Sequence, residues 1–236
     1  PIKMTKDLPP RPAAFTSERL YTRRIQCTYG WDWVGRFVTM GIFRDVRLEF
    51  RKPNSISSAY VYTKNINPYS AQIALEANIS NLIIDLDDIL ITILDPDENQ
   101  IYAKKRRILD AAIYETIDIP TPRLWYPIGY GEQPLYTLVL ATSNSTQRIK
   151  FGIREVTVLQ IEDTPDSEYY KKCCELRQLK HLQQWDHNES FSGFIVLVNG
   201  IKIMCKGANW IPCEPFPSAE TPEKIEKLVF LAADAG

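Results

Sequence analysis

Histidine is scarce in this 236-residue sequence, and its scarcity limits the catalytic chemistry that the chain can carry. The two histidines, His181 and His187, lie in one polar stretch close to Cys173 and Cys174. A Ser-His-Asp or Cys-His relay needs a histidine held beside a nucleophile, and a solvated helix does not provide that geometry. We therefore expect no catalytic relay in this stretch.

Motifs for metals and phosphates are also lacking. The five cysteines match no paired zinc-ligand spacing, and neither a dinucleotide-binding nor a P-loop glycine motif is present. A bridge between the adjacent Cys173 and Cys174 would be strained, so we interpret the cysteines as mostly reduced, buried thiols. We expect no metal site and no cofactor.

The chain has neither an excess of charge nor a long apolar run. Its 28 Lys and Arg balance 29 Asp and Glu, whereas a nucleic-acid binder needs surplus cations to displace counterions. No apolar run approaches the roughly 18 residues of a membrane span. We therefore expect neither a nucleic-acid nor a membrane partner. The aromatic content of 11% suits both a β-rich protein and a carbohydrate binder.

The two ends of the sequence are unusual. It begins with Pro1, shows no signal-peptide pattern, and stops at Gly236 while a helix-like segment is still running. We expect both ends to be cut from a longer chain, so the sequence does not predict a compartment.

Alternation of apolar and polar residues predicts a mainly β protein. It begins with a half-buried strand at 43–50 and continues as an immunoglobulin-like antiparallel sandwich over 50–162. Turn signals such as Asn67-Pro68 separate the seven expected strands. These strands are 56–65, 71–80, 88–94, 100–106, 112–119, 135–141 and 149–161. The expected buried set includes Ile73, Leu75, Leu90, Ile93, Ile117, Leu138 and Leu140.

The sequence changes character after the sandwich. Residues 163–193 are polar and helix-compatible, which predicts a surface insertion. Strands at 194–198 and 201–206 flank the hairpin signal Asn199-Gly200. Thr221-Pro222-Glu223 then predicts a helix start, with Ile225, Leu228, Val229 and Ala232 on one face. We expect the strand edge at 194–198 to be exposed and the end of the chain to be weakly ordered or to pair with another copy.

Two aromatic segments are candidate binding sites, and each has two interpretations. In Trp31-Asp32-Trp33, the indoles could cover the apolar face of a sugar while the carboxylate accepts hydroxyl hydrogens. The segment could equally be a core tryptophan pair with Asp32 capping backbone amides. Asn209-Trp210 follows a strand, where barrel enzymes place ligand-facing side chains, but could also simply pack a turn.

These segments resemble motifs of glycoside hydrolase family 2, in its β-mannosidase-like branch. QCTYGWDW (26–33) and GIFRDVRLE (41–49) are similar to the end of the family's N-terminal sugar-binding jelly roll. LWYPIGYGEQPLYTLVL (124–140) and FGIREV (151–156) are similar to its immunoglobulin-like domain. FIVLVNGIKIMCKGANWIP (194–212) is similar to the entry of its catalytic (β/α)8 barrel. Together these motifs cover most of the chain in the family's order.

The resemblance implies four parts for the chain. Residues 1–49 would be the tail of a jelly roll, 50–162 the sandwich, 163–193 an insertion, and 194–236 the first strand and helix of the barrel. The implied activity is a retaining, exo-acting glycosidase of β-mannosidase or β-galactosidase type, which removes a terminal β-linked sugar. The alternative is a non-catalytic β-sandwich module that binds carbohydrate or protein.

The resemblance also implies which site residues the chain holds. The family's two catalytic Glu residues match no Glu here, so the chain alone is expected to be inactive and to bind the remainder of its own chain. The implied substrate-binding residues are Trp31, Asp32, Trp33, Asn209 and Trp210. One departure bears on specificity: Trp33 is followed by Val34-Gly35-Arg36, where the family often has Gly-Pro or Ala-Pro.

Overall fold

The structure, a computed structural model of the chain, describes residues 17–42, 44–178 and 192–236. It divides into two compact units, which are considered separately below. One unit is Glu49–Lys206, and the other combines Pro1–Leu48 with Gly207–Gly236. Among the described residues, no helix is long and apolar enough to cross a membrane.

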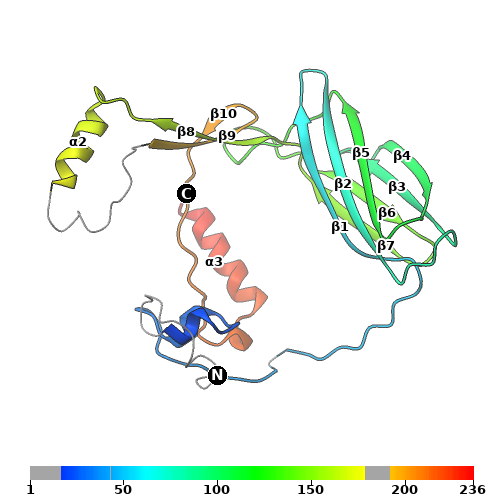
Figure 1. Cartoon of the computed structure of the whole chain (residues 1–236), viewed down its shortest axis with the longest axis horizontal. Helices are drawn as coiled ribbons and strands as arrows, with labels where there is room; N and C mark the ends of the chain where they lie inside the picture. The colour runs from blue at the N-terminus through cyan, green and yellow to red at the C-terminus, as the bar shows by residue number, and fades with distance from the viewer. Residues whose placement is uncertain (1–16, 43, 179–191) are drawn as a thin grey trace. The chain divides into compact units, whose positions relative to one another are not determined.

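Seven antiparallel strands of the larger unit form a sandwich of two sheets (Figure 1). The three-stranded sheet has the order β1-β2-β5 and the four-stranded sheet the order β4-β3-β6-β7, a Greek-key arrangement of the immunoglobulin-like type. The strands are β1 (Ser55–Ile66), β2 (Ser70–Ser80), β3 (Asp88–Leu94), β4 (Gln100–Arg107), β5 (Ala112–Pro120), β6 (Tyr136–Ala141) and β7 (Thr146–Phe151). The predicted sandwich is thus observed, and most predicted strand ends agree within about two residues.

The core between the sheets follows the expected alternation, with one error. Ile73, Leu75, Ile93, Ile117, Leu138 and Leu140 are all at most 2% exposed, as predicted. Leu90, however, is 42% exposed, while its neighbours Ile89 and Ile91 are fully buried. Successive side chains of a strand point to opposite faces, so Leu90 could not share a face with Ile93 three positions later.

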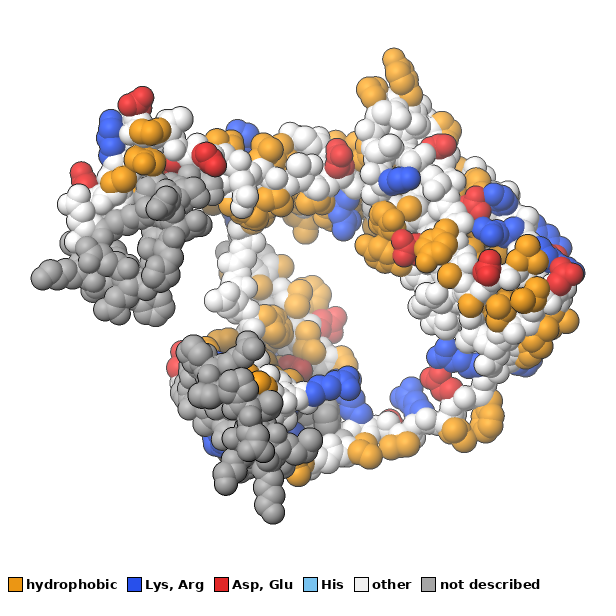
Figure 2. All heavy atoms as spheres, in the orientation of Figure 1, with side chains coloured by type: hydrophobic (Ala, Val, Ile, Leu, Met, Phe, Trp, Pro, Cys, Tyr) orange, Lys and Arg blue, Asp and Glu red, His pale blue; other side chains and the backbone are white. Residues whose placement is uncertain are grey.

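The final predicted sandwich strand is divided in two. β7 ends at Phe151, and β8 (Val156–Glu162) leaves the sandwich to join β9 (Ser192–Val198) and β10 (Ile201–Ile203) in a separate antiparallel sheet. β9 is the central strand of that sheet and pairs with β8 over its whole length, so the edge expected at 194–198 is not free. Apolar side chains are nevertheless visible along this sheet (Figure 2), and Val156, Val158 and Phe194 are at least half exposed.

The tryptophan of the 124–140 motif connects the sandwich to the smaller sheet. Trp125 N donates to Ile153 O at 2.9 Å, and its indole lies under the guanidinium of Arg154, whose central carbon is 4.5 Å from the ring centroid. Asn199 Nδ2 donates to Trp125 O at 3.1 Å, and Asn199 Oδ1 accepts from Glu155 N at 2.9 Å. The motif residues therefore build a structural joint at the end of the sandwich.

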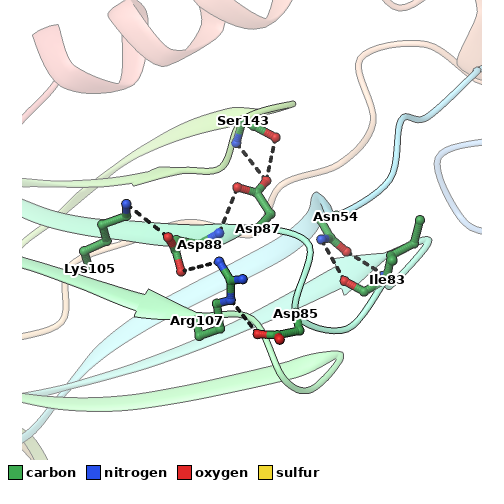
Figure 3. A network of polar contacts seen from close by, with 8 residues as sticks. All are labelled: Asn54, Ile83, Asp85, Asp87, Asp88, Lys105, Arg107 and Ser143. Carbon is green, nitrogen blue, oxygen red and sulfur yellow. Dashed lines mark hydrogen bonds and ion pairs between the residues drawn. The ribbon is translucent and has the colours of Figure 1, made fainter.

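A polar network closes the opposite end of the sandwich (Figure 3). Asn54 is fully buried, and its amide bonds both backbone groups of Ile83, donating to the carbonyl at 3.0 Å and accepting from N–H at 2.8 Å. Arg107 bridges Asp85 and Asp88 nearby. A buried amide with both partners satisfied fixes this loop, because losing either bond would leave a polar group unpaired.

The insertion contains a shorter helix than the sequence suggested. α2 (Glu168–Arg177) begins after Ser167, whose side chain accepts a hydrogen bond from Tyr170 N at 3.1 Å. The segment from 163 to the cap is not helical, and residues 179–191, with both histidines, lie outside the described residues.

The described part of the smaller unit, 17–42 with 44–48 and 207–236, contains short turns and the helix α3. It contains the 3-10 turns η1 (Ser17–Leu20), η2 (Gln26–Tyr29) and η3 (Pro217–Ala219), and α3 (Pro222–Asp234). Thr221 caps α3 by accepting from Lys224 N, as predicted, and no residue of α3 is buried. The strand predicted at 43–50 is wrong for its described part, where Val46, Leu48 and Phe50 are more than 80% exposed. A strand needs a neighbour for its backbone groups, and no described segment pairs with this one.

Candidate functional site

The Trp31-Asp32-Trp33 segment lies at the tip of a tight reversal in the smaller unit. It follows η2 through Gly30, whose φ of 110° lies in the region that favours glycine. Trp31 N then donates to Val34 O at 3.0 Å, and Val34 N donates back to Trp31 O at 3.4 Å. This pair of bonds presents Asp32 and Trp33 on a closed turn, which holds their backbone in place.

Three tryptophans from distant parts of the sequence line one open pocket of about 410 Å³ in this unit. They are Trp31, Trp33 and Trp210, and Ile211 and Pro212 continue the wall beside Trp210. Trp31 is 41% exposed and Trp210 is 54% exposed, so neither is a core residue. The two aromatic segments found in the sequence therefore meet at one pocket, and Trp31 is not buried in a core.

The two polar candidates lie next to this pocket in sequence but not on its wall. Asp32 and Asn209 are both exposed, and neither is among the residues that line the pocket. Their side chains are therefore available to a ligand that extends beyond the indoles. The structure brings together three of the five predicted site residues and leaves two at the margin.

Arg19 is a pocket residue that the sequence analysis did not identify. It comes from η1, is 9% exposed, and lies with its guanidinium carbon 5.2 Å from the centroid of the Trp31 ring. Its Nε and Nη1 have no hydrogen-bond partner among the described residues. A cation over an indole face orients that ring. No motif surrounds Arg19, so the sequence carries no signal for this contact.

Residues that follow Trp210 in the same loop contact other parts of the smaller unit. The rings of Phe37 and Phe216 lie with centroids 5.3 Å apart, and Lys224 of α3 forms an ion pair with Glu214. The hydrogen bond to Glu214 raises the pKa of Lys224. Burial, followed by the nearby Glu220, raises the pKa of Cys213, whose thiol donates to that carboxylate at 3.5 Å.

The wall of this pocket is mainly aromatic and aliphatic, with Gln26, Cys27 and a single charged side chain, Arg19. No pair of carboxylates that could act as acid and nucleophile is among its described lining residues. Indole faces cover apolar C–H surfaces, while the polar groups at the margin can exchange hydrogen bonds with hydroxyls. Among the described residues, no group of three or more His, Cys, Asp or Glu could hold a metal ion.

Comparisons with known proteins agree on one family. Residues 54–154 match the sequence profile described as "Glycosyl hydrolases family 2". "Beta-mannosidase B" of Emericella nidulans is 29% identical over 222 residues, and the match covers 91% of this chain and 23% of that protein. "Beta-mannosidase B" of Thermothelomyces thermophilus is also 29% identical, over 84% of this chain and 21% of that protein.

Two solved structures share the fold of this chain. The crystal structure of β-D-mannosidase from Dictyoglomus thermophilum superposes with a TM-score of 0.76 and 26% identity, covering 99% of this chain and 27% of that one. A β-glucuronidase from Parabacteroides merdae, at 15% identity and a TM-score of 0.55, shares the fold over 77% of this chain.

The sandwich at the centre of this chain therefore resembles a domain of glycoside hydrolase family 2. The similarity extends past the sandwich: about nine-tenths of the chain is similar to members of the β-mannosidase-like branch of that family. It spans about a quarter of the length of the curated relatives and of the β-mannosidase structure that it matches.

Proposed function

We propose that this chain is part of a retaining, exo-acting glycoside hydrolase that removes a terminal β-linked sugar, specifically a β-mannoside. The observation that carries the proposal is the pocket that Trp31 and Trp33 share with Trp210. An aromatic wall with hydrogen-bonding groups at its margin suits a pyranose ring. The similarity to β-mannosidases supports mannose over the galactose alternative.

The residues of the pocket have distinct roles in this proposal. The three indoles pack against the apolar face of the sugar, and Arg19 holds the Trp31 ring in position. Asp32 accepts hydroxyl hydrogens, and Asn209 both donates and accepts at the pocket margin. The two Glu residues of the double displacement come from sequence outside these 236 residues, so the chain alone binds weakly and does not hydrolyse.

The domain assignments belong to the same proposal. Residues 1–49 are the end of a sugar-binding jelly roll, and 194–236 begin the catalytic barrel. The exposed apolar residues of α3, among them Ile225, Leu228 and Val229, are then covered by the remainder of the longer protein. In the isolated chain the same surface supports a homodimer.

The proposal is tested by comparing two proteins on one panel of substrates. A protein extended to the length of the relatives should hydrolyse 4-nitrophenyl β-mannoside faster than the β-galactoside and β-glucuronide, whereas the 236-residue chain should hydrolyse none. Two Glu residues, one of them in an Asn-Glu pair, should follow Gly236 on barrel strands. A longer protein that folds but cleaves no β-glycoside would support the non-catalytic binding module instead.

A further inference from the structure

A second surface with the composition of a saccharide site lies on the sandwich, in the larger unit. It is a groove of about 540 Å³ where β1 and β7, the open edge strands of the two sheets, approach each other. Hydrogen bonds join β1 to the residues just before and just after β7. Ser145 Oγ accepts from Ile56 N at 2.8 Å, and Thr63 Oγ1 accepts from Arg154 N at 3.2 Å.

An exposed pair of tyrosines forms one side of the groove. Tyr60 and Tyr62 project from the outer face of β1 with ring centroids 5.3 Å apart and an angle of 28° between their planes. Tyr60 is 62% exposed, although its ring is already stacked on its neighbour. Exposed aromatic rings contact water unfavourably, and this pair does not contribute to the core. Exposed apolar surfaces of this kind are typical of binding sites.

Two cations form the other side. Lys150 of β7 and Arg154 are both exposed and line the groove, and neither has a carboxylate partner among the described residues. The guanidinium of Arg154 is held in place by stacking on Trp125. Elsewhere on the sandwich, Lys104, Arg107 and Arg148 are each paired with an acid. The groove therefore has hydrogen-bond donors with no carboxylate partner among the described residues, next to an exposed pair of aromatic rings.

An acceptor, Glu76, lies beside the tyrosine pair, although it does not line the groove itself. Glu76 lies opposite Tyr60 on β2 and accepts a hydrogen bond from the Tyr62 hydroxyl at 3.4 Å. A carboxylate at this position repels an acidic peptide or an anionic polymer, but it accepts readily from neutral hydroxyls. Sugar hydroxyls both donate and accept, so they match Glu76 on one side and Lys150 with Arg154 on the other.

We propose that this groove binds a neutral oligosaccharide, with a pyranose ring on Tyr60 and hydroxyl groups bonded to Lys150, Arg154 and Glu76. The inference does not rest on the hydrolase activity proposed above, because the groove and the tryptophan pocket share no residue. In a glycosidase, such a site would hold the part of a glycan chain that is not being cleaved.

Calorimetric titration of the 236-residue chain with β-1,4-mannohexaose tests the proposal. Tyr60→Ala and Lys150→Gln should each weaken binding about three- to tenfold, whereas Tyr60→Phe keeps the ring and should bind like the original chain. Tyr69→Ala is the matched control, because Tyr69 is 80% exposed and lies outside the groove. Amide shifts on titration should centre on 59–63 and 149–154.

Three results would overturn the proposal. The first is the absence of binding to the original chain. The second is binding that Trp33→Ala abolishes and Tyr60→Ala leaves unchanged, which would assign the oligosaccharide to the tryptophan pocket. The third is tighter binding of a hexaglutamate peptide than of mannohexaose, which would make the groove a docking site for an acidic segment.

Discussion

The indole of Trp125 occupies the space that a side chain at position 152 would need. A Cβ built on Gly152 would lie 2.7 Å from Trp125 Cγ and 2.8 Å from its Cβ. The two residues are 27 positions apart in the sequence. The close approach of the indole therefore requires a residue without a side chain at position 152.

Gly152→Ala should therefore destabilise the sandwich by about 1–3 kcal/mol, because the indole and its backbone must shift to admit one methyl group. Urea unfolding followed by the circular dichroism of the strands measures the loss. Gly207→Ala is the control, since nothing lies within 4 Å of its added Cβ, and it should change stability little. Equal unfolding midpoints for the Gly152 variant and the original chain would contradict this account.

The register of β3 predicts opposite outcomes for two adjacent residues. Ile91→Ala should cost about 2–5 kcal/mol because Ile91 is fully buried, whereas Leu90→Ala should change stability by less than about 0.5 kcal/mol because Leu90 is 42% exposed. Hydrogen exchange of the β6 amides, which pair with β3, reports both changes. A larger loss at Leu90 than at Ile91 would show that the register is shifted by one residue.

The acid response of the sandwich should depend on Ser143. Asp87 Oδ2 accepts from Ser143 Oγ at 2.6 Å and from Ser143 N at 3.0 Å, and the hydroxyl bond is the main reason that the pKa of Asp87 is lowered (Figure 3). A carboxyl whose pKa is lowered by folding stabilises the protein above its unfolded pKa of about 3.9 and loses that contribution as pH falls through the folded value.

Ser143→Ala should raise the pKa of Asp87 and cost about 1 kcal/mol near neutral pH, since the group is partly solvated. The difference between the variant and the original chain should shrink as the pH falls through the lowered folded-state pKa of Asp87, because below it the carboxyl is protonated in both the folded and the unfolded state. Unfolding free energies measured across this range give the comparison. A difference that stays constant with pH would assign the effect of Ser143 to packing.

Period-2 alternation was sufficient to predict the sandwich because each of its strands has one face in the core and the other in water. The rest depended on contacts between distant segments. β8 leaves the sandwich because residues 152–155 bond to Trp125 and Asn199, and no local pattern reports those partners. Residues 44–50 alternate like a strand but pair with no segment that the structure describes. Trp31, Trp33 and Trp210 were found by residue type, whereas Arg19 acts only through its position over Trp31.

Asp32 is expected to contribute binding without contributing stability, because its side chain is exposed on the Trp31–Val34 reversal. In a protein of the relatives' full length, Asp32→Ala should lower kcat/KM about 10- to 150-fold, the value of a charged hydrogen bond to a sugar hydroxyl. Asp32→Asn should recover part of this loss. Reduced solubility with unchanged kcat/KM would instead give Asp32 a structural role in the turn.

The central claim is that Trp33 and Trp210 contact the same sugar, and a double-mutant cycle on kcat/KM in the longer protein tests it most directly. Trp33→Ala and Trp210→Ala should each lower kcat/KM for 4-nitrophenyl β-mannoside by about tenfold or more, and Tyr69→Ala should not. The double variant should lose clearly less than the product of the two single losses, because removing one wall weakens the hold of the other on the shared ring. Single variants with unchanged kcat/KM, or losses that multiply as independent effects, would contradict a shared sugar pocket.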